Sequence, residues 1–188
     1  MLNFTKMSMN LLGRPCRSES MKTGRLAFTN PTSQSMNIRG IHKSGNMKDG
    51  LELIVTARNF AQMAHTGQFR RDGKTPYFQH VDGVARLVKP QKPEYIATAY
   101  LHDVIEDTNY SSVDLLKIGM PMIVVDAVLL LTKFDHQPYE EYLKDVKENV
   151  IARAVKIADM TYNLNDTPSQ KQIDKYNKGL EYLNDNKN

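Results

Sequence analysis

From residue 51 onward, apolar residues recur at helical spacing almost without interruption, and this periodicity limits the fold more than any other feature. Leu51, Ile54, Val55 and Ala61 form one stripe that ends at Gly67, as expected for a helix with one buried face. Similar stretches continue along the chain, with neither a hairpin signal nor an internal repeat. The sequence therefore predicts an all-α fold. The expected helices cover residues 51–67, 80–88, 93–105, 112–119, 121–133, 138–148, 150–164 and 170–184.

The N-terminal part differs from the rest. We predict that residues 1–48 form a basic, disordered or loosely packed extension of an ordered domain at residues 49–188. The first 50 residues hold eight of the 25 Lys and Arg residues but only two of the 21 Asp and Glu residues, and Gly or Pro breaks each candidate helix. Three interpretations stay open: a plain tail, an organellar transit peptide, or a misassigned start, with Met36 and Met47 as later starts.

Composition argues against several classes of protein. The whole chain carries +4, but residues 51–188 are slightly acidic, which gives no general reason to expect a nucleic-acid-binding protein. The longest apolar stretch, near Ile123–Leu131, contains Asp126 and is too short to cross a bilayer. Cys16 is the single cysteine, so we expect a reducing compartment and no intramolecular disulfide. We therefore expect a cytoplasmic protein, or an organellar one if a transit peptide is present.

The segment 101–108 places four titratable residues in an otherwise apolar helix. His102 and Glu106 are four residues apart and would share one helix face, as would Asp103 and Asp107. Burying such groups without partners would cost on the order of several kcal/mol each. A divalent cation would satisfy them together. The alternative is a helix end that exposes ordinary surface carboxylates.

Two further residues favour the metal site. His80 opens a helix after a short turn, and Asp159 interrupts the apolar run of a late helix, although a lone acid there could also face solvent. With His102 and Asp103 they would form a set of two imidazole and two carboxylate ligands. Such a set suits Mn²⁺, Fe²⁺ or Zn²⁺ better than Ca²⁺. It also leaves positions open for water and a phosphate oxygen.

The order His, His-Asp, Asp resembles the signature of the HD superfamily of metal phosphohydrolases. More narrowly, the chain resembles the hydrolase domain of RelA/SpoT proteins and the small alarmone hydrolases over about residues 52–166. The matching stretches are Ala57–Ala61 with His65 and Gln68, Asp72–Tyr77 leading to His80, Ala99–Thr108, Leu131–Lys133, Lys156–Asp159 and Tyr162–Leu164. This resemblance implies an HD-domain helical bundle. It also implies hydrolysis of the 3′-pyrophosphate of guanosine alarmones, which yields GDP from ppGpp and GTP from pppGpp.

The resemblance also implies a role for individual residues. The ligands of one Mn²⁺ ion, or of Fe²⁺ or Zn²⁺, would be His80, His102, Asp103 and Asp159. Glu106 and Asp107 correspond to the acidic pair that orients and activates the attacking water. The residues expected at the nucleotide are Arg70, Arg71, Tyr162 and Asn163, with Lys133 and Lys156 as neighbours of the phosphates. His65 is expected to be structural, and His136 to be exposed.

Two positions depart from the family pattern without removing a metal ligand. Val81 follows His80 where proline is usual, and Met160 follows Asp159 where a basic residue is common. A phosphatase of another nucleotide, such as NADPH or a deoxynucleotide, therefore stays an alternative within the same fold.

Two alternatives to an enzyme are a nucleotide-sensing module and a nucleic-acid-binding protein. A nucleotide-sensing module without catalysis predicts the loss of a ligand or of the acidic pair, and all six residues are present. A nucleic-acid-binding function would have to rest on the basic tail. We expect a small-molecule nucleotide substrate, no nucleic-acid or membrane partner, and leave the oligomeric state open.

Overall fold

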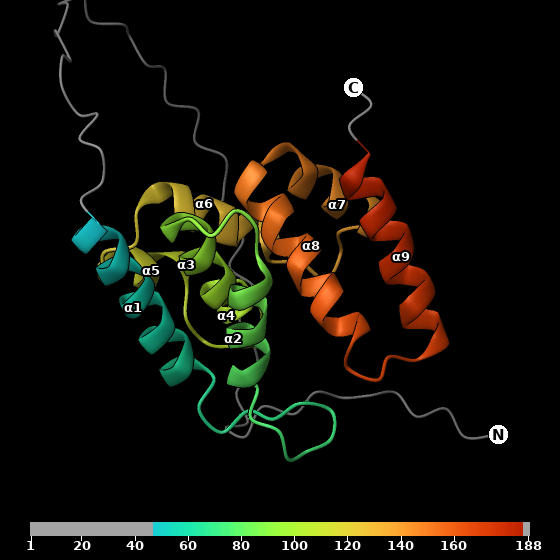
Figure 1. Cartoon of the computed structure of the whole chain (residues 1–188), viewed down its shortest axis with the longest axis horizontal. Coiled ribbons are helices and arrows are strands. Elements are labelled where there is room, and N and C mark those ends of the chain that lie inside the picture. Colours follow the sequence, from blue (N-terminus) through green and yellow to red (C-terminus); the bar gives the residue numbers. More distant parts are fainter. Residues whose placement is uncertain (1–46, 186–188) are drawn as a thin grey trace, which may run out of the picture. The chain divides into compact units, whose positions relative to one another are not determined.

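A computed structural model describes residues 47–185, and all regular elements in this range are helices (Figure 1). The expected all-α class is confirmed. The predicted N-terminal extension lies outside the described residues, apart from residues 47 and 48, which begin the first helix. The helices are α1 (Met47–Ala64), α2 (Phe78–Leu87), α3 (Pro93–Leu101), α4 (Val104–Asp107), α5 (Ser112–Lys117), α6 (Met122–Leu131), α7 (Tyr139–Glu148), α8 (Val150–Leu164) and α9 (Gln170–Asn184).

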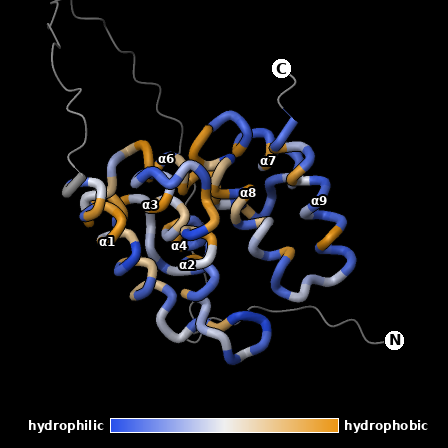
Figure 2. Tube along the Cα trace, viewed as in Figure 1, coloured by the Kyte–Doolittle hydropathy of each residue, from blue (hydrophilic) through white to orange (hydrophobic). Residues whose placement is uncertain are grey.

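The core is built around α3, which contacts α1, α2, α6 and α8. Ala97, Ala99 and Leu101 are fully buried, and the small alanines let the neighbouring helices approach closely. In Figure 2, apolar residues gather on α6, whereas α9 and the segment between α1 and α2 are mostly polar. None of the described helices is both long and apolar enough to cross a membrane.

The prediction of one continuous helix over residues 93–105 is wrong. The structure has two helices, α3 and α4, separated by a turn at His102 and Asp103, where Asp103 adopts φ −100° and ψ −3°. Consecutive residues of a regular helix point in directions about 100° apart. Because both side chains turn toward one centre, as described below, the backbone departs from the helical path between them.

The basic segment between α1 and α2 is more ordered than a polar loop without a hairpin signal would suggest. Phe69 and Pro76 form an isolated antiparallel bridge, and Arg70 N–H donates to the Thr75 carbonyl at 2.8 Å. The Asp72 carboxylate closes the turn by accepting from the backbone N–H groups of Lys74 and Thr75, both at 2.9 Å. This local turn fixes the backbone on which Arg70 and Arg71 are carried.

Close packing joins α2 to α8 at Gly83. A Cβ atom at this position would overlap the ring of Tyr162, so only glycine fits without a shift of that ring. The same ring lies 5.1 Å from the His80 ring, centroid to centroid. The helix that carries His80 and the helix that carries Asp159 are therefore held at a short, defined separation.

Asn149 caps the N-terminus of α8, and we predict that its removal destabilises the domain. Its side-chain oxygen accepts from the backbone N–H groups of Ile151 and Ala152, both at 3.0 Å. Asn149→Ala should lower the free energy of unfolding by about 1 kcal/mol, since two helix donors lose their partner. Urea denaturation measures this loss. Asn149→Ser is the control that keeps a cap, and equal stability of the Ala and Ser variants would contradict the prediction.

Candidate metal centre

Four side chains from α2, the turn after α3, and α8 converge at one point. His80 and His102 are each 2% exposed and Asp159 is 6% exposed. His80 Nε2 lies 3.4 Å from Asp103 Oδ2 and 3.3 Å from Asp159 Oδ1. His102 Nε2 lies 3.1 Å and 3.9 Å from the same two oxygens. The structure thus brings together all four residues of the predicted ligand set.

The orientation of the His102 ring suits a metal ligand. Its Nδ1 lies 2.8 Å from the Ala99 carbonyl oxygen, which can only accept, so Nδ1 carries the proton. Its Nε2 is buried and lies 3.1 Å from Asp103 Oδ2, but it forms no hydrogen bond of regular geometry within residues 47–185. Ligating histidines characteristically use one ring nitrogen for a backbone or carboxylate partner and the other for the metal. The ligand atoms of His80, His102 and Asp159 lie within 4.8 Å of one another, so the residues present fit a divalent cation.

The charges at this centre favour a cation. Burial opposes ionisation of Asp103, but His102 and His80 outweigh it and hold the pKa of this carboxyl well below its usual range. Burial likewise opposes a charge on His102, yet Asp103 and Asp159 raise the pKa of this imidazole to about 9. The two carboxylates therefore remain ionised and attract positive charge, which a proton or a metal ion can supply.

Glu106 and Asp107 lie beside the ligands on α4. Burial, followed by the charge of Asp103, raises the pKa of the Asp107 carboxyl. Burial also raises the pKa of Glu106, although its side chain accepts a hydrogen bond from Lys133 N–H at 2.9 Å. A carboxylate with a raised pKa binds a proton more readily, which suits a general base.

Tyr77 is a site residue for which the sequence suggested no role. Its hydroxyl donates to Asp103 Oδ2 at 2.6 Å, and its ring lies 4.9 Å from the ring of His65. Burial and the charges of Asp103 and Asp107 raise the pKa of Tyr77, so the hydroxyl stays protonated and continues to donate. The position directly before α2 was visible in the sequence, but a hydroxyl contact to a residue 26 positions later was not.

A cavity of about 290 Å³ opens beside His80, Asp103 and Asp159, three of the four predicted ligands. It brings together most of the predicted site residues, and adds two aromatic residues that sequence analysis did not select, Phe69 and Tyr176. Tyr176 comes from the polar helix α9, where nothing in the local pattern separates it from other tyrosines. The lining residues are Phe69, Arg70, Arg71, Tyr77, His80, Asp103, Glu106, Asp107, Asp159, Asn163 and Tyr176.

The predicted nucleotide contacts differ in how far they are already paired. Arg70 Nη2 donates to Asp166 Oδ2 at 2.6 Å and to Asn163 Oδ1 at 3.0 Å, so its guanidinium is held in place. Arg71 Nη1 donates to Gln172 Oε1 on α9 at 2.8 Å. Asn163 also donates to Asp159 Oδ1 at 2.6 Å. This bond connects the predicted nucleotide contacts Arg70 and Asn163 to a predicted metal ligand.

The other three predicted contacts do not line the cavity. Lys156 Nζ is paired with Asp159 Oδ2 at 2.9 Å, and Lys133 Nζ donates to the Phe134 carbonyl oxygen at 3.1 Å. Tyr162 packs against Gly83, and its hydroxyl lies 3.4 Å from the Gln79 carbonyl oxygen. Lys156 and Tyr162 instead contact predicted ligands, Asp159 and His80 respectively.

His65 and His136 are the other histidines of the described residues, expected to be structural and exposed, respectively. His65 is buried, and its Nδ1 lies 2.7 Å from Gln68 Oε1, while Gln68 Nε2 donates to the Asp107 carbonyl at 2.8 Å. These contacts join the end of α1 to the end of α4, which is a structural role. His136 is exposed in the turn after α6.

Comparisons with known proteins agree on one family. A family model described as an HD domain matches residues 57–149. The guanosine-3′,5′-bis(diphosphate) 3′-pyrophosphohydrolase MESH1 of Xenopus tropicalis is 33% identical over 130 residues, which cover 64% of this chain and 72% of that protein. A guanosine-3′,5′-bis(diphosphate) 3′-pyrophosphohydrolase of Haemophilus influenzae is 32% identical over 116 residues, which cover 55% of this chain but 17% of that longer protein.

A solved structure gives the same result for the fold. It is described as "A metazoan ortholog of SpoT hydrolyzes ppGpp and plays a role in starvation responses". The match has a TM-score of 0.58 and 27% sequence identity, and it covers 70% of this chain and 85% of the other. The chain is therefore similar to a protein of that description in fold as well as in sequence.

We predict that His102→Gln abolishes stable binding of a divalent cation, because its Nε2 is lost. The fall in affinity should exceed the roughly 10–100-fold typical of residues one contact further from a metal. Titration calorimetry with Mn²⁺ and elemental analysis after dialysis measure it. His136→Gln is the matched control and should bind as the wild type does. Equal affinity of the two variants would exclude His102 from the ligand set.

Proposed function

Because the chain belongs to the family of HD-domain guanosine-3′,5′-bis(diphosphate) 3′-pyrophosphohydrolases, we propose that it hydrolyses the 3′-pyrophosphate of guanosine alarmones. It converts ppGpp to GDP and pyrophosphate, and pppGpp to GTP and pyrophosphate. One observation in the structure carries this function. Two buried imidazoles and two carboxylates form one cluster, and His80, Asp103 and Asp159 of this cluster line a cavity that also holds the acidic pair Glu106 and Asp107.

The cation is assigned to His80, His102, Asp103 and Asp159, and we propose Mn²⁺ as its identity, with Fe²⁺ or Zn²⁺ as alternatives. Two imidazoles with two carboxylates form a mixed donor set that suits these ions better than Ca²⁺. When bound, such a cation polarises a phosphoryl oxygen and lowers the pKa of a coordinated water. The Tyr77 hydroxyl, 2.6 Å from Asp103 Oδ2, orients one of the carboxylates for this task.

Side chains of the protein then take part in proton transfer as the ribose 3′-oxygen leaves. Water adds to the phosphorus next to the ribose 3′-oxygen, and the bond to that oxygen breaks with its electron pair. Glu106 or Asp107 accepts the proton of the water, which their raised pKa values favour. The leaving oxygen takes up a proton, so guanosine 5′-diphosphate and pyrophosphate are released from ppGpp.

Arg70, Arg71 and Asn163 are proposed to bind the nucleotide at the mouth of the cavity. An arginine fork suits phosphate oxygens and also stacks on planar bases. Arg70 is pre-positioned by Asp166 and lies over the Tyr77 ring, with its Cζ 5.8 Å from the ring centroid. Phe69, 55% exposed at the same cavity, offers a surface on which a base can stack.

The substrate assignment predicts a defined product pattern. Purified full-length protein with Mn²⁺ should release GDP and pyrophosphate from ppGpp, with little turnover of NADPH or of a panel of deoxynucleotides. Asp103→Ala should remove the activity, because a ligand is lost. Product chromatography decides the outcome. Turnover of another nucleotide in place of ppGpp would overturn the substrate, and metal binding without any turnover would indicate a nucleotide sensor.

The acidic pair should affect catalysis and leave the cation in place. Glu106→Gln and Asp107→Asn are each expected to lower kcat by about 10²–10⁴-fold, the usual contribution of a general base. Neither residue is assigned as a ligand, so the Mn²⁺ content should stay at the wild-type level. Glu148→Gln, an exposed acid at the end of α7, is the control. Loss of metal from the Glu106 or Asp107 variant would contradict the assigned division of roles.

A further inference from the structure

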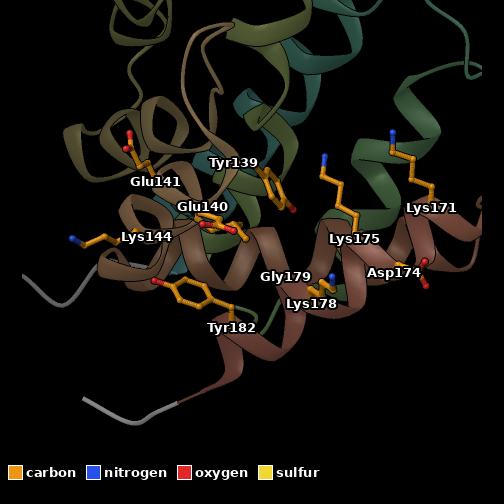
Figure 3. Close-up of a pocket in the computed structure, with 11 residues that line it drawn as sticks. Tyr139, Glu140, Glu141, Lys144, Lys171, Asp174, Lys175, Lys178, Gly179 and Tyr182 are labelled. Carbon is orange, nitrogen blue, oxygen red and sulfur yellow. The ribbon is translucent and has the colours of Figure 1, made fainter.

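A second, larger cavity lies between α7 and α9, next to the catalytic one. It measures about 900 Å³, and Figure 3 shows Tyr139 from α7 facing Lys175 from α9. Lys171 and Lys175 extend from α9 to the same side. Lys175 and Tyr176 are consecutive, and the first lines this cavity whereas the second lines the cavity of the metal centre. The two cavities are therefore neighbours along α9.

Lys175 is a cation without a carboxylate partner. Its Nζ lies 4.2 Å from the centroid of the Tyr139 ring, and within residues 47–185 no carboxylate oxygen lies within 4.0 Å of it. Two other basic groups near the metal centre form ion pairs: Lys156 pairs with Asp159, and Arg70 pairs with Asp166. A cation held only by a ring face keeps its hydrogen-bond donors available.

Charges of both signs act on Lys175. Partial burial, and then the neighbouring ammonium groups of Lys156 and Lys133, lower the pKa of Lys175, while Asp159 and Glu106 act in the opposite direction. These neighbours belong to the catalytic centre, so Lys175 stands close enough to sense its charge. An anion placed beside the Lys175 ammonium would stabilise its charged form.

We infer that Lys175 binds the phosphate groups of the substrate that are not hydrolysed, where the α7–α9 cavity adjoins Tyr176. The inference rests on the proposed function. A guanosine 3′,5′-bis(diphosphate) carries an anionic chain on each side of the nucleoside, and only the 3′ chain reacts at the cation. The cavity of about 290 Å³ beside the metal centre is small for a nucleotide with two diphosphate chains, which leaves the neighbouring α7–α9 cavity available for the 5′ chain.

Lys175 is accordingly a specificity-determining residue, and it acts on binding more than on chemistry. Its effect should grow with the number of 5′-phosphates, because each added phosphate brings more negative charge to the same ammonium group. The hydrolysed bond lies elsewhere, so kcat should hardly change.

The test compares three substrates that carry one, two or three phosphates at the 5′ position and the same 3′-diphosphate. Lys175→Gln should raise KM about tenfold for the 5′-diphosphate and by at least as much for the 5′-triphosphate. The 5′-monophosphate should be affected least, and kcat should stay within about twofold for all three. Lys175→Arg should restore most of the affinity, since it retains the positive charge.

Lys147→Gln is the matched control. Lys147 also lies over a tyrosine ring, with its Nζ 4.5 Å from the centroid of Tyr182, and its replacement removes the same charge away from the metal centre. If Lys175→Gln and Lys147→Gln give the same KM values, or if the KM increase is equal for all three substrates, the inference is wrong while the proposed function stands. If the wild type hydrolyses none of the three substrates, the proposed function fails, and the inference fails with it.

Discussion

The structure depends on the burial of two carboxylates and two imidazoles around one point. Asp103 and Asp159 stay ionised there, and charges of this kind are tolerated inside a protein only when each has a compensating partner. Lys156, the two histidines and the Tyr77 hydroxyl supply part of that compensation, and a divalent cation would complete it. The ligands lie on α2, α8 and the turn between α3 and α4, so these elements must meet at this point.

The break between α3 and α4 and the hydrogen bond of His102 are both local consequences of this demand. The turn at 102–103 lets two adjacent side chains reach one centre. The Ala99 carbonyl, which would accept within a longer helix, instead accepts from His102 Nδ1–H, which leaves Nε2 directed at Asp103 and Asp159. Irregular backbone here is therefore part of how the site is built, and not a packing defect.

Much of the fold and the ligand set was predictable because both leave strong patterns in the sequence. Helical periodicity defined α8 and α9 to the residue, and His80, His102, Asp103 and Asp159 stand out as polar groups in apolar surroundings. Tyr77 and Tyr176 were missed because their roles arise from contacts between distant segments, on surfaces where a tyrosine is ordinary. Likewise, only the structure could separate Lys175 from the other lysines of α9, because its distinction lies in what surrounds it.

The tight fit of Gly83 against Tyr162 has a consequence for how this protein can diverge. A larger residue at 83 has room only if the ring at 162 shrinks or swings away, and that ring lies beside His80. Substitutions at the two positions are therefore coupled, since a larger residue at 83 fits only with a matching change at 162. An alanine at 83 alone would press on the Tyr162 ring, and through it on His80, so the change at 162 has to come first or with it.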